Sequence, residues 1–509
     1  MTTRTWSVDE TVAGIVCRHR RLPSSMRRAR WRTAAFVGLL HAALLVPIVA
    51  AQNPVYPAGP PFRPIPGPEV TLRDLRGELQ NKTTGTFTVT SVGDMFWRAP
   101  VAKRMSPVLR DLMRNADITV GNMEGGVGFD PALTASAFAD LGFDFLAPGE
   151  FGGGPQLQIA TEALDKYGIK LAGAGANLTT ARRPALQEVP EGLVAFIHAC
   201  PGDNLCGPRA TNTAQGVNPL GVTVWNTVTQ EQFNQLKALE TSILARRTEA
   251  DVAQPSSMAP PLPPGRMSWL GQNYVVAEKP GELRHELNTG DERALVLAVR
   301  NAKEVSDFVI FHMHDHLNRS LFQAYSYNNY PADYLRPLLH KLIDNGLDMY
   351  VGSGVHTMQG IEIYKGRPIF YNQGNIGIDL TRNLDSTVEA DGLTATERSE
   401  RNRAGYFWYE SNSIAYVANT TYTDGKLVEI RIYPVDIGLR ERPWSREHVP
   451  MTPTPEKARS ILAQLQQYSE PFGTKISIEN NIGIIRVPSE ATVDVGVDLD
   501  LPGWRPSTR

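Results

Sequence analysis

Cysteine is scarce in this chain, which has three in 509 residues. Cys17 lies in the N-terminal segment, so Cys200 and Cys206, in the stretch HACPGDNLCGP, are the pair available to the rest of the chain. Two thiolates in one short loop lack the second pair of ligands that structural zinc needs, which disfavours a thiolate metal site. Two cysteines that bracket a Pro/Gly/Asn turn can approach closely enough to bond. The spacing therefore predicts a small loop disulfide between Cys200 and Cys206.

The sequence also lacks an excess of charge of either sign. It holds 51 Lys and Arg against 53 Asp and Glu, a formal net charge of -2 at pH 7. Such a balance produces no overall field that would favour nucleic acid or an acidic polymer. We therefore expect no nucleic-acid partner.

One apolar run near the N-terminus, TAAFVGLLHAALLVPIVAAQ (33–52), suggests contact with a membrane. It follows an arginine-rich stretch without acidic residues (18–32) and ends in small residues. This order predicts a cleaved secretory signal peptide over 1–51 and an exported protein, periplasmic or extracellular. An uncleaved membrane anchor is the alternative interpretation of the same run. Met26 is a candidate for the true start of the chain.

Proline-rich stretches mark the predicted boundaries of the folded part. Residues 52–82 contain QNPVYPAGPPFRPIPGP and are predicted to be a linker. We expect one domain over 83–440, with a loop insertion at about 246–268 that is rich in Pro, Ser and Ala. The remainder, 441–509, is predicted to hold a helix over 454–468 and a tail.

Strand-like and helix-like periodicities alternate from Thr86 onward. The strand-like segments are 86–94, 117–124, 143–150, 169–175, 306–314 and 347–356, and the helix-like ones are 99–116, 133–142, 154–168, 228–246, 292–305 and 331–346. Alternating β and α units predict a mainly parallel sheet covered by helices. After Gly360 the period changes to two, with turn signals at Lys365-Gly366 and Asp424-Gly425, which predicts hairpins in a second, more antiparallel sheet.

Polar residues stand where the predicted strands end. Open α/β sheets collect their functional sites at the carboxyl ends of the strands, so these residues are expected to share one crevice. Carboxylate oxygen together with imidazole nitrogen suits divalent Mn, Fe or Zn better than Ca or Mg. A one- or two-metal hydrolytic centre is therefore the main hypothesis. The strand-end residues are Asp94, Asn122, Glu124, Glu150, His312, His314, Asp315, His316 and His356.

Six sequence blocks between Phe87 and Asp379 carry a family resemblance. They are SVGDMFW, DITVGNMEGG, LGFDFLAPGE, YGIKLAGAGAN, SDFVIFHMHDH and LIDNGLDMYVGSGVHTMQGIEIYKGRPIFYNQGNIGID. In this order they resemble the bacterial capsule and poly-γ-glutamate synthesis proteins of the CapA family, whose fold is similar to calcineurin-like metallophosphatases. The resemblance implies a four-layer α/β sandwich and a cell-surface polymer or peptide-like substrate with a phosphoester or amide link.

The resemblance and the strand-end pattern together assign roles to individual residues. We expect metal ligands at Asp94, Glu124, Glu150, His312, His314 and His356. We expect catalytic roles for His314, His356 and Asp315. We expect substrate contacts from Asn122, His316 and Asn375, the last of which ends YNQGN where the family has Tyr-x-x-Gly-Asn.

Two departures from the family pattern keep other interpretations open. The family has Asn-Asn-His where this chain has PGE at 148–150, and it has a histidine where this chain has Ser353. Because two expected nitrogen ligands are missing, a site without metal is an alternative. It would make the protein a metal-independent acid–base isomerase or epimerase of a peptide-like substrate, or a non-catalytic periplasmic scaffold on a decayed enzyme fold. His198 has no predicted partner and is left out of the site.

Overall fold

The computed structural model describes residues 80–97, 100–127, 130–149, 154–201, 206–245, 262–317, 329–378, 410–438 and 449–488. The chain divides into one unit over 1–70 and a second over 71–509, which holds every described residue. The predicted signal peptide, nearly all of the proline-rich linker, most of the loop insertion, residues 489–509 of the C-terminal tail and Glu150 lie outside the described residues. The first part of the predicted tail is not without structure, since it forms a short 3-10 helix and two strands over 470–486. Within the described ranges, no helix has the combination of length and apolar character that a membrane span requires.

The first sheet has a parallel half and an antiparallel half that meet at β1 (Thr86–Phe96). The parallel half continues from β1 through β2 (Ile118–Met123), β3 (Phe145–Pro148) and β4 (Lys170–Leu171). The antiparallel half continues through β19 (Ile414–Thr423), β20 (Lys426–Asp436), β22 (Ile482–Arg486) and β21 (Ser477–Glu479). A short strand, β18 (Asn375–Ile378), pairs in parallel with the end of β1.

The second sheet is parallel at its centre and antiparallel at its edges. Its order is β16 (Ile361–Tyr364), β17 (Arg367–Phe370), β15 (Met349–Gly354), β14 (Phe308–Asp315), β7 (Gly192–Pro201) and β6 (Ala185–Val189). The four inner strands of this series are parallel to one another. β9 (Pro219–Leu220) adds to the end of β7.

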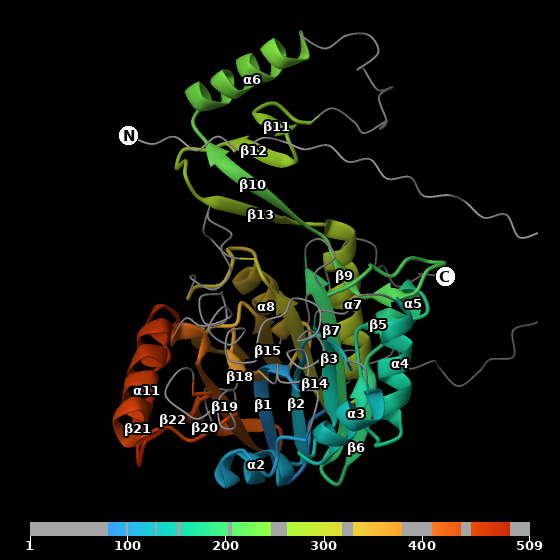
Figure 1. Ribbon diagram of the computed structural model, residues 1–509, viewed down its shortest axis with the longest axis vertical. Helices are drawn as coiled ribbons and strands as arrows, with labels where there is room; N and C mark the ends of the chain where they lie inside the picture. Colours follow the sequence, from blue (N-terminus) through green and yellow to red (C-terminus); the bar gives the residue numbers. More distant parts are fainter. Residues whose placement is uncertain are drawn as a thin grey trace, which may run out of the picture. The chain divides into compact units, whose positions relative to one another are not determined.

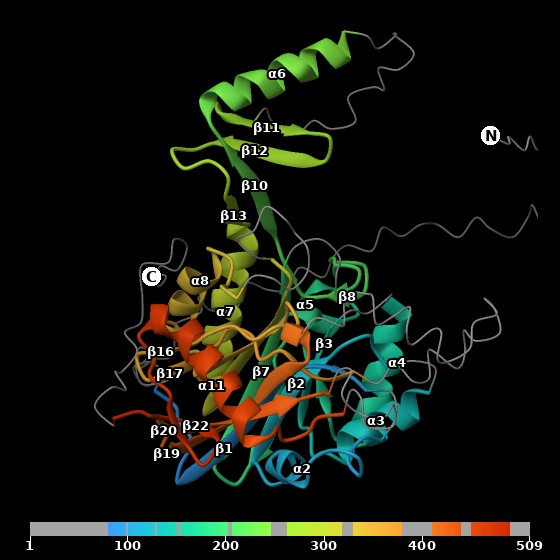
Figure 2. The same ribbon diagram turned by 60° about the vertical axis from the view of Figure 1, so that its left-hand side comes forward.

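The two sheets pack face to face, and helices cover their outer faces (Figures 1 and 2). Aromatic rings join the sheets, since the Phe87 and Phe308 centroids lie 5.1 Å apart and those of Phe145 and Phe196 also lie 5.1 Å apart. Burying each such side chain stabilises the fold by about 1.5–3 kcal/mol. The first sheet is covered by α2 (Pro107–Arg114), α3 (Pro131–Ala139) and α4 (Gly154–Asp165), and the second by α7 (Thr289–Val305) and α8 (Leu335–Ile343). The four-layer α/β sandwich predicted from the metallophosphatase resemblance is thus confirmed.

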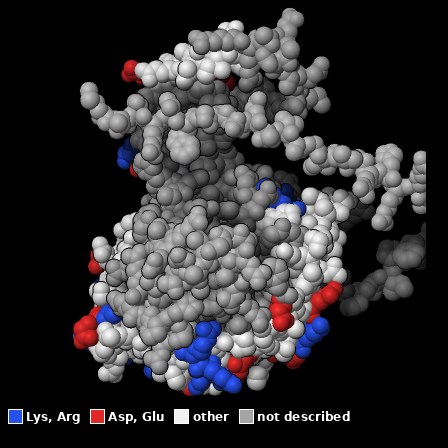
Figure 3. Space-filling view, in the orientation of Figure 1, with Lys and Arg blue, Asp and Glu red and all other residues white. Residues whose placement is uncertain are grey.

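Smaller elements complete the described part. A separate sheet is formed by β11 (Arg266–Trp269), β12 (Gln272–Val276), β10 (Val222–Val228) and β13 (Leu283–Leu287), with α6 (Gln230–Leu244) packed on β12. The other pieces are β5 (Ala174–Gly175), β8 (Gly216–Val217), α5 (Leu178–Ala181), η2 (Glu410–Asn412), α11 (Pro455–Ser469) and η4 (Glu470–Phe472). On the described part of the face in Figure 3, basic and acidic side chains both occur, in keeping with the balanced composition.

Three predicted boundaries are wrong. The helix predicted over 99–116 begins only at Pro107, because a proline ring disfavours the helical conformation of the preceding residue, and Ser106 has an extended ψ of 128°. The strand predicted over 169–175 is split into β4 and β5. The predicted loop insertion ends early, since β11 begins at Arg266.

The hairpins after Gly360 do exist, but their assignment to one antiparallel second sheet is corrected. The hairpin that turns at Lys365-Gly366 extends the second sheet, whereas the one that turns at Asp424-Gly425 extends the first. A period of two identifies strands and a short turn identifies their pairing with each other. Neither identifies the sheet edge on which the hairpin docks.

Alternation along β14 decides which polar residues face the space between the sheets. Phe308 and Ile310 belong to the core between the sheets, and Val309, Phe311 and Met313 belong to the core under α7 and α8. Side chains two positions apart share a face of a strand. His312 and His314 therefore continue the inner face.

Candidate functional site

Carboxyl ends of strands from both sheets converge on one buried cluster. Asp94 lies on β1, Asn122 on β2 and His314 on β14, and their side chains are almost completely buried. The His314 Nδ1 atom lies 3.4 Å from Glu124 Oε2 and 3.7 Å from Asp94 Oδ1. Side chains that are far apart in the sequence thus meet between the sheets. We call Asp94, Asn122, Glu124, His314, His316 and His356 the strand-end cluster.

Asn122 sits at the centre of three groups that carry lone pairs. Its Nδ2 atom lies 2.7 Å from Asp94 Oδ1, 2.6 Å from Glu124 Oε2 and 3.1 Å from His314 Nδ1. An amide nitrogen has only two hydrogens, so it cannot satisfy three acceptors at once. Its Oδ1 atom is buried and has no hydrogen-bond partner among the described residues. This set of oxygen and nitrogen donors would be satisfied better by a cation than by one amide group.

His356 follows β15 and has an uncommon backbone conformation. Its φ of +58° lies in the left-handed region, where strain of this kind often accompanies functional sites. Its Nδ1 atom lies 2.9 Å from Asn375 Oδ1 and 3.1 Å from Asp94 Oδ2. The backbone amide of Gly354 donates to the same Asp94 oxygen at 3.0 Å. The turn after β15 therefore holds His356 against the end of β1.

His316 links the two other histidines of the cluster. Its Nε2 atom lies 2.8 Å from His314 Nε2, and its ring centroid lies 5.6 Å from that of His356. His316 is half-buried, whereas His314 and His356 are buried. Two groups within the described residues could hold a metal ion: Glu124 with His316 and His356, and Asp94 with Glu124 and His314. In each group the ligand atoms lie within 4.8 Å of one another, and Glu124 belongs to both.

Burial favours the neutral forms of His314 and His316, and the contact with His356 favours the ionised form of Asp94. Burial lowers the pKa of His314 well below its usual range, and the nearby His316 lowers it further. Burial and the charge of His356 lower the pKa of His316 to about 3. Burial raises the pKa of Asp94, but its hydrogen bond and charge interaction with His356 outweigh this and leave the pKa well below the usual range. Neutral imidazoles and ionised carboxylates are the forms that bind metal ions.

Asp315 has its hydrogen-bond partners away from the strand-end cluster. Its carboxylate accepts hydrogen bonds from the Tyr334 hydroxyl at 2.6 Å and from the Leu317 amide at 2.7 Å. Its neighbour His314 faces the other side of the strand, because adjacent side chains point to opposite faces. Burial raises the pKa of Asp315 to about 6. The predicted catalytic role of Asp315 is therefore not supported by its position.

His312 also lies apart from the carboxylates. Its Nδ1 atom lies 3.0 Å from Nδ1 of His198, and the Nε2 atoms of both rings are buried without a hydrogen-bond partner among the described residues. The structure thus pairs His312 with a histidine and not with the expected metal ligands. His198 was missed by sequence reasoning because its position opposite His312 depends on the register of β7 against β14. No local pattern in HACPG encodes that register.

Gly149 stands in the stretch PGE (148–150), where this chain departs from the family pattern, and the cluster requires its small size. A Cβ atom built on Gly149 would overlap Glu124 Oε2 and lie 2.9 Å from Asn122 Nδ2. Its amide donates to the Met123 carbonyl at 3.0 Å, which holds this backbone against the end of β2. The chain needs a glycine here because no side chain fits beside Glu124. The neighbouring Glu150, a predicted ligand, lies outside the described residues.

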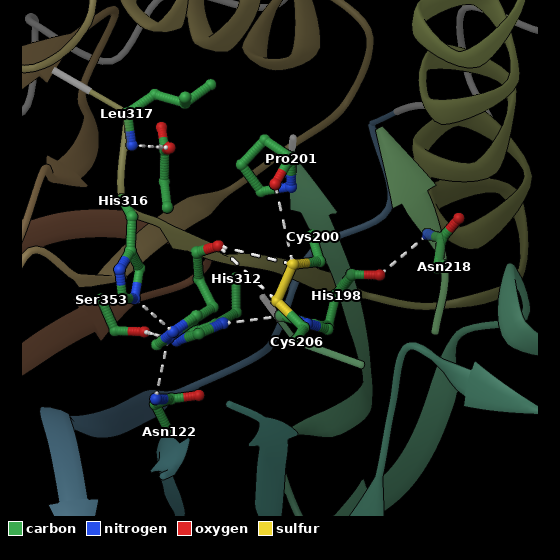
Figure 4. Close-up of a disulfide and its surroundings, with 12 residues drawn as sticks. Asn122, His198, Cys200, Pro201, Cys206, Asn218, His312, His316, Leu317 and Ser353 are labelled. Atoms are coloured by element: carbon green, nitrogen blue, oxygen red, sulfur yellow. Dashed lines mark hydrogen bonds between the residues drawn. A yellow bond between two sulfur atoms is a disulfide. The ribbon is translucent and has the colours of Figure 1, made fainter. Parts of the chain in front are cut away.

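The predicted disulfide between Cys200 and Cys206 is confirmed, with Cα atoms 6.2 Å apart. Both sulfur atoms lie 3.9 Å from the carbonyl oxygen of His314 (Figure 4). The cysteines are buried at the end of β7, the strand beside β14. The disulfide therefore packs against the backbone of a cluster residue.

Comparisons with known proteins place this chain among relatives of similar length. The family model described as "Bacterial capsule synthesis protein PGA_cap" matches residues 156–379. Two proteins of Sinorhizobium fredii (strain NBRC 101917 / NGR234), y4sH and y4uA, are each 30% identical over 468 residues, which cover 81% of this chain and 96% of theirs. The PGA biosynthesis protein CapA of Bacillus subtilis (strain 168) is 32% identical over 100 residues, which cover 19% of this chain and 24% of CapA.

Solved structures resemble the chain more weakly. A hypothetical protein from Thermus thermophilus has a TM-score of 0.32 at 10% identity, and the match covers 69% of this chain and 99% of that protein. The NAD nucleotidase of Haemophilus influenzae has a TM-score of 0.28 at 9% identity, and the match covers 78% of this chain and 62% of the nucleotidase. These scores are too low to carry an argument. The family match covers three of the six sequence blocks, those between residues 167 and 379. With the relatives, it places the chain in the bacterial capsule synthesis protein PGA_cap family.

Proposed function

We propose that this protein is an exported, metal-assisted hydrolase that acts on a phosphoester or amide link of a cell-surface polymer. The observation that carries the proposal is the pair of potential ligand groups that share Glu124 between the carboxyl ends of the two sheets. The donors are carboxylate oxygens and imidazole nitrogens, which suit Mn, Fe or Zn. The crowded amide of Asn122 supports the same interpretation, because three acceptors surround one nitrogen.

The described residues fit one or two divalent ions. Asp94, Glu124 and His314 would hold one ion, and Glu124 with His316 and His356 would hold a second. A bound ion of this kind polarises a phosphoryl or acyl oxygen and lowers the pKa of water, so that hydrolysis proceeds near neutral pH.

The protein's own side chains would supply orientation and proton transfer. Asp94 holds His356 through Nδ1, and the backbone amide of Gly354 fixes that carboxylate in turn. His316 is the half-buried member of the cluster, so a substrate would meet the cluster at this ring. With a single ion held by Asp94, Glu124 and His314, the neutral His316 ring could instead accept a proton from the attacking water. Exclusion of water by the two sheets strengthens every electrostatic contact in the cluster.

The substrate class is proposed from the family. The family is described by capsule synthesis, and the Bacillus relative is named for PGA biosynthesis. A capsule polymer or a peptide-like chain joined by amide links would fit these descriptions. Export is supported by the signal-like segment before Gln52 and by the disulfide, since disulfides persist in oxidising compartments.

Activity after chelation tests the proposal. The mature protein is assayed on a generic phosphodiester and on poly-γ-glutamate, before and after treatment with a chelator and after addition of Mn²⁺ or Zn²⁺. We expect turnover of one substrate that is lost on chelation, restored by metal, and reduced at least about 100-fold in His356→Ala. Chelator-insensitive activity with deuterium incorporation from solvent would instead support the acid–base isomerase. No turnover and no metal binding would support the scaffold.

A further inference from the structure

Asn375 was expected to contact substrate, but its side chain is completely buried. It lies at the start of β18, opposite Asp94 in the parallel pairing of β1 with β18. Its Nδ2 atom donates to the backbone carbonyl of Asn412 at 3.2 Å, and its Oδ1 atom lies 2.9 Å from His356 Nδ1. Its amide therefore joins the backbone of Asn412 to the ring of His356.

The contact with Asn412 fixes which way the Asn375 amide points. If the amide were rotated by half a turn, its oxygen would face the Asn412 carbonyl oxygen, and two acceptors would repel each other. The oxygen must therefore face His356. Because a carbonyl oxygen only accepts, Nδ1 of His356 has to carry a hydrogen.

The second partner of His356 Nδ1 leads to the same conclusion. Asp94 Oδ2 lies 3.1 Å away and, as an ionised carboxylate, is also an acceptor without a hydrogen. Asp94 cannot turn away, because Gly354 donates to Oδ2 at 3.0 Å and Asn122 donates to Oδ1 at 2.7 Å. Two fixed acceptors thus face one ring nitrogen. When the imidazole is neutral, its single N–H is on Nδ1 and its lone pair is on Nε2.

We propose that Asn375 is a positioning residue that, together with Asp94, holds neutral His356 in the Nδ1–H form and so makes Nε2 the nitrogen that ligates a cation or accepts a proton. Its consequence for metal binding or proton transfer rests on the proposed hydrolase function. The position of the proton on the His356 ring does not depend on that function. Hydrogen bonds to the far nitrogen of a ligating histidine generally fix the form of its ring in this way.

The left-handed backbone of His356 explains why such a hold is needed. A residue with a φ of +58° is kept there by its surroundings and has no regular strand or helix to orient its side chain. Two hydrogen bonds at Nδ1 define the plane of the ring as well as its proton. Loss of Asn375 removes one of the two acceptors at Nδ1 and so weakens the hold on the ring.

The test is nuclear magnetic resonance of ¹⁵N-histidine-labelled, metal-free protein, recorded as the pH is raised until the His356 ring nitrogens show the shifts of a neutral imidazole. The His356 signals are assigned with His356→Gln. In the wild type we expect the Nδ1–H form to predominate, although free neutral imidazole prefers the Nε2–H form. Asn375→Ala should shift the population towards Nε2–H.

A matched control is Asn345→Ala, which removes another buried asparagine side chain, one that contacts Arg300 and Lys341. It should leave the His356 signals unchanged. A wild-type ring in the Nε2–H form, or an unchanged population in a folded Asn375→Ala protein, would overturn the proposal. Metal titration is the second readout, and Asn375→Ala should bind about 10–100-fold more weakly than the wild type. Wild-type protein that binds no metal would contradict the proposed hydrolase, while the proton position would still be decided by the spectra.

Discussion

At the scale of single residues, the cluster depends on side chains and on one missing side chain. The Asn122 amide contacts both Glu124 and Asp94 within 2.7 Å. Gly149 closes over Asn122 and Glu124 at a distance that admits no Cβ atom. A glycine whose backbone lies this close to a functional group acts through its size.

Gly149→Ala should therefore damage the cluster directly. The added methyl group overlaps Glu124, so the site must shift, and we expect a loss of about 1–3 kcal/mol in the free energy of unfolding together with weaker metal binding. Urea denaturation and metal titration measure the two effects. Gly168→Ala is the control, because Gly168 has a φ of +78° but no atom within 4 Å of its added Cβ. It should lose stability and keep its metal affinity, and equal losses of affinity in both variants would contradict the role of Gly149.

Asp315→Asn tests whether Asp315 has the catalytic role predicted from the sequence. Asp315 contacts Tyr334 and Leu317 and not the cluster, so the variant should keep its metal affinity and turnover within about twofold of the wild type, a change of less than about 0.5 kcal/mol. The measurement is a side-by-side titration and rate assay. A large drop in turnover, with an unchanged unfolding midpoint, would show that Asp315 acts in catalysis.

At the scale of elements, the neighbouring strands β7 and β14 carry His198, His312 and His314. Their parallel register sets His198 opposite His312, and the disulfide at the end of β7 lies against His314. The same two strands thus hold a buried imidazole pair, a covalent link and part of the strand-end cluster. Changes in these strands are expected to affect stability and the site together.

The buried His198 should make stability depend on pH. Burial lowers its pKa from an unfolded value of 6.5 to about 3 in the folded protein. Between these values the unfolded chain binds more protons, so the free energy of unfolding should rise as pH rises from about 3 to 6.5 and level off above. Urea denaturation across this range measures the slope. His198→Gln should make the slope shallower but not remove it, because His314 and His316 also have lowered pKa values. An equally steep profile in the variant would assign the slope to other groups.

Removal of the disulfide should cost stability through the entropy of the unfolded chain. The sequence separation of Cys200 and Cys206 is 6, and closing so short a loop stabilises the fold by about 2 kcal/mol. We expect the double variant Cys200→Ser with Cys206→Ser to have a free energy of unfolding about 2 kcal/mol lower than the wild type, and so to unfold at a lower urea concentration. An unchanged midpoint would show that the bond adds no stability.

At the scale of the whole molecule, the layers follow from sequence periodicity. Apolar alternation along β14 and amphipathic helices such as α7 and α8 are local patterns, and they predict a helix-covered sheet. The sheet that each late hairpin joins, and the pairing of His198 with His312, depend on long-range register that no local pattern encodes. The predicted role of Asp315 rests on its histidine neighbours in HMHDH, and the sequence pattern does not show that its own carboxylate contacts Tyr334.

The central claim is that the strand-end cluster binds a divalent metal ion. Elemental analysis of purified wild type, His314→Ala and His312→Ala tests it most directly, since the two histidines share a strand and a face but only His314 contacts the carboxylates. We expect about one or two equivalents of Mn, Fe or Zn in the wild type and in His312→Ala, and markedly less metal in His314→Ala. No metal in the wild type after growth and dialysis in metal-supplemented buffer, or equal metal in His314→Ala, would contradict the account.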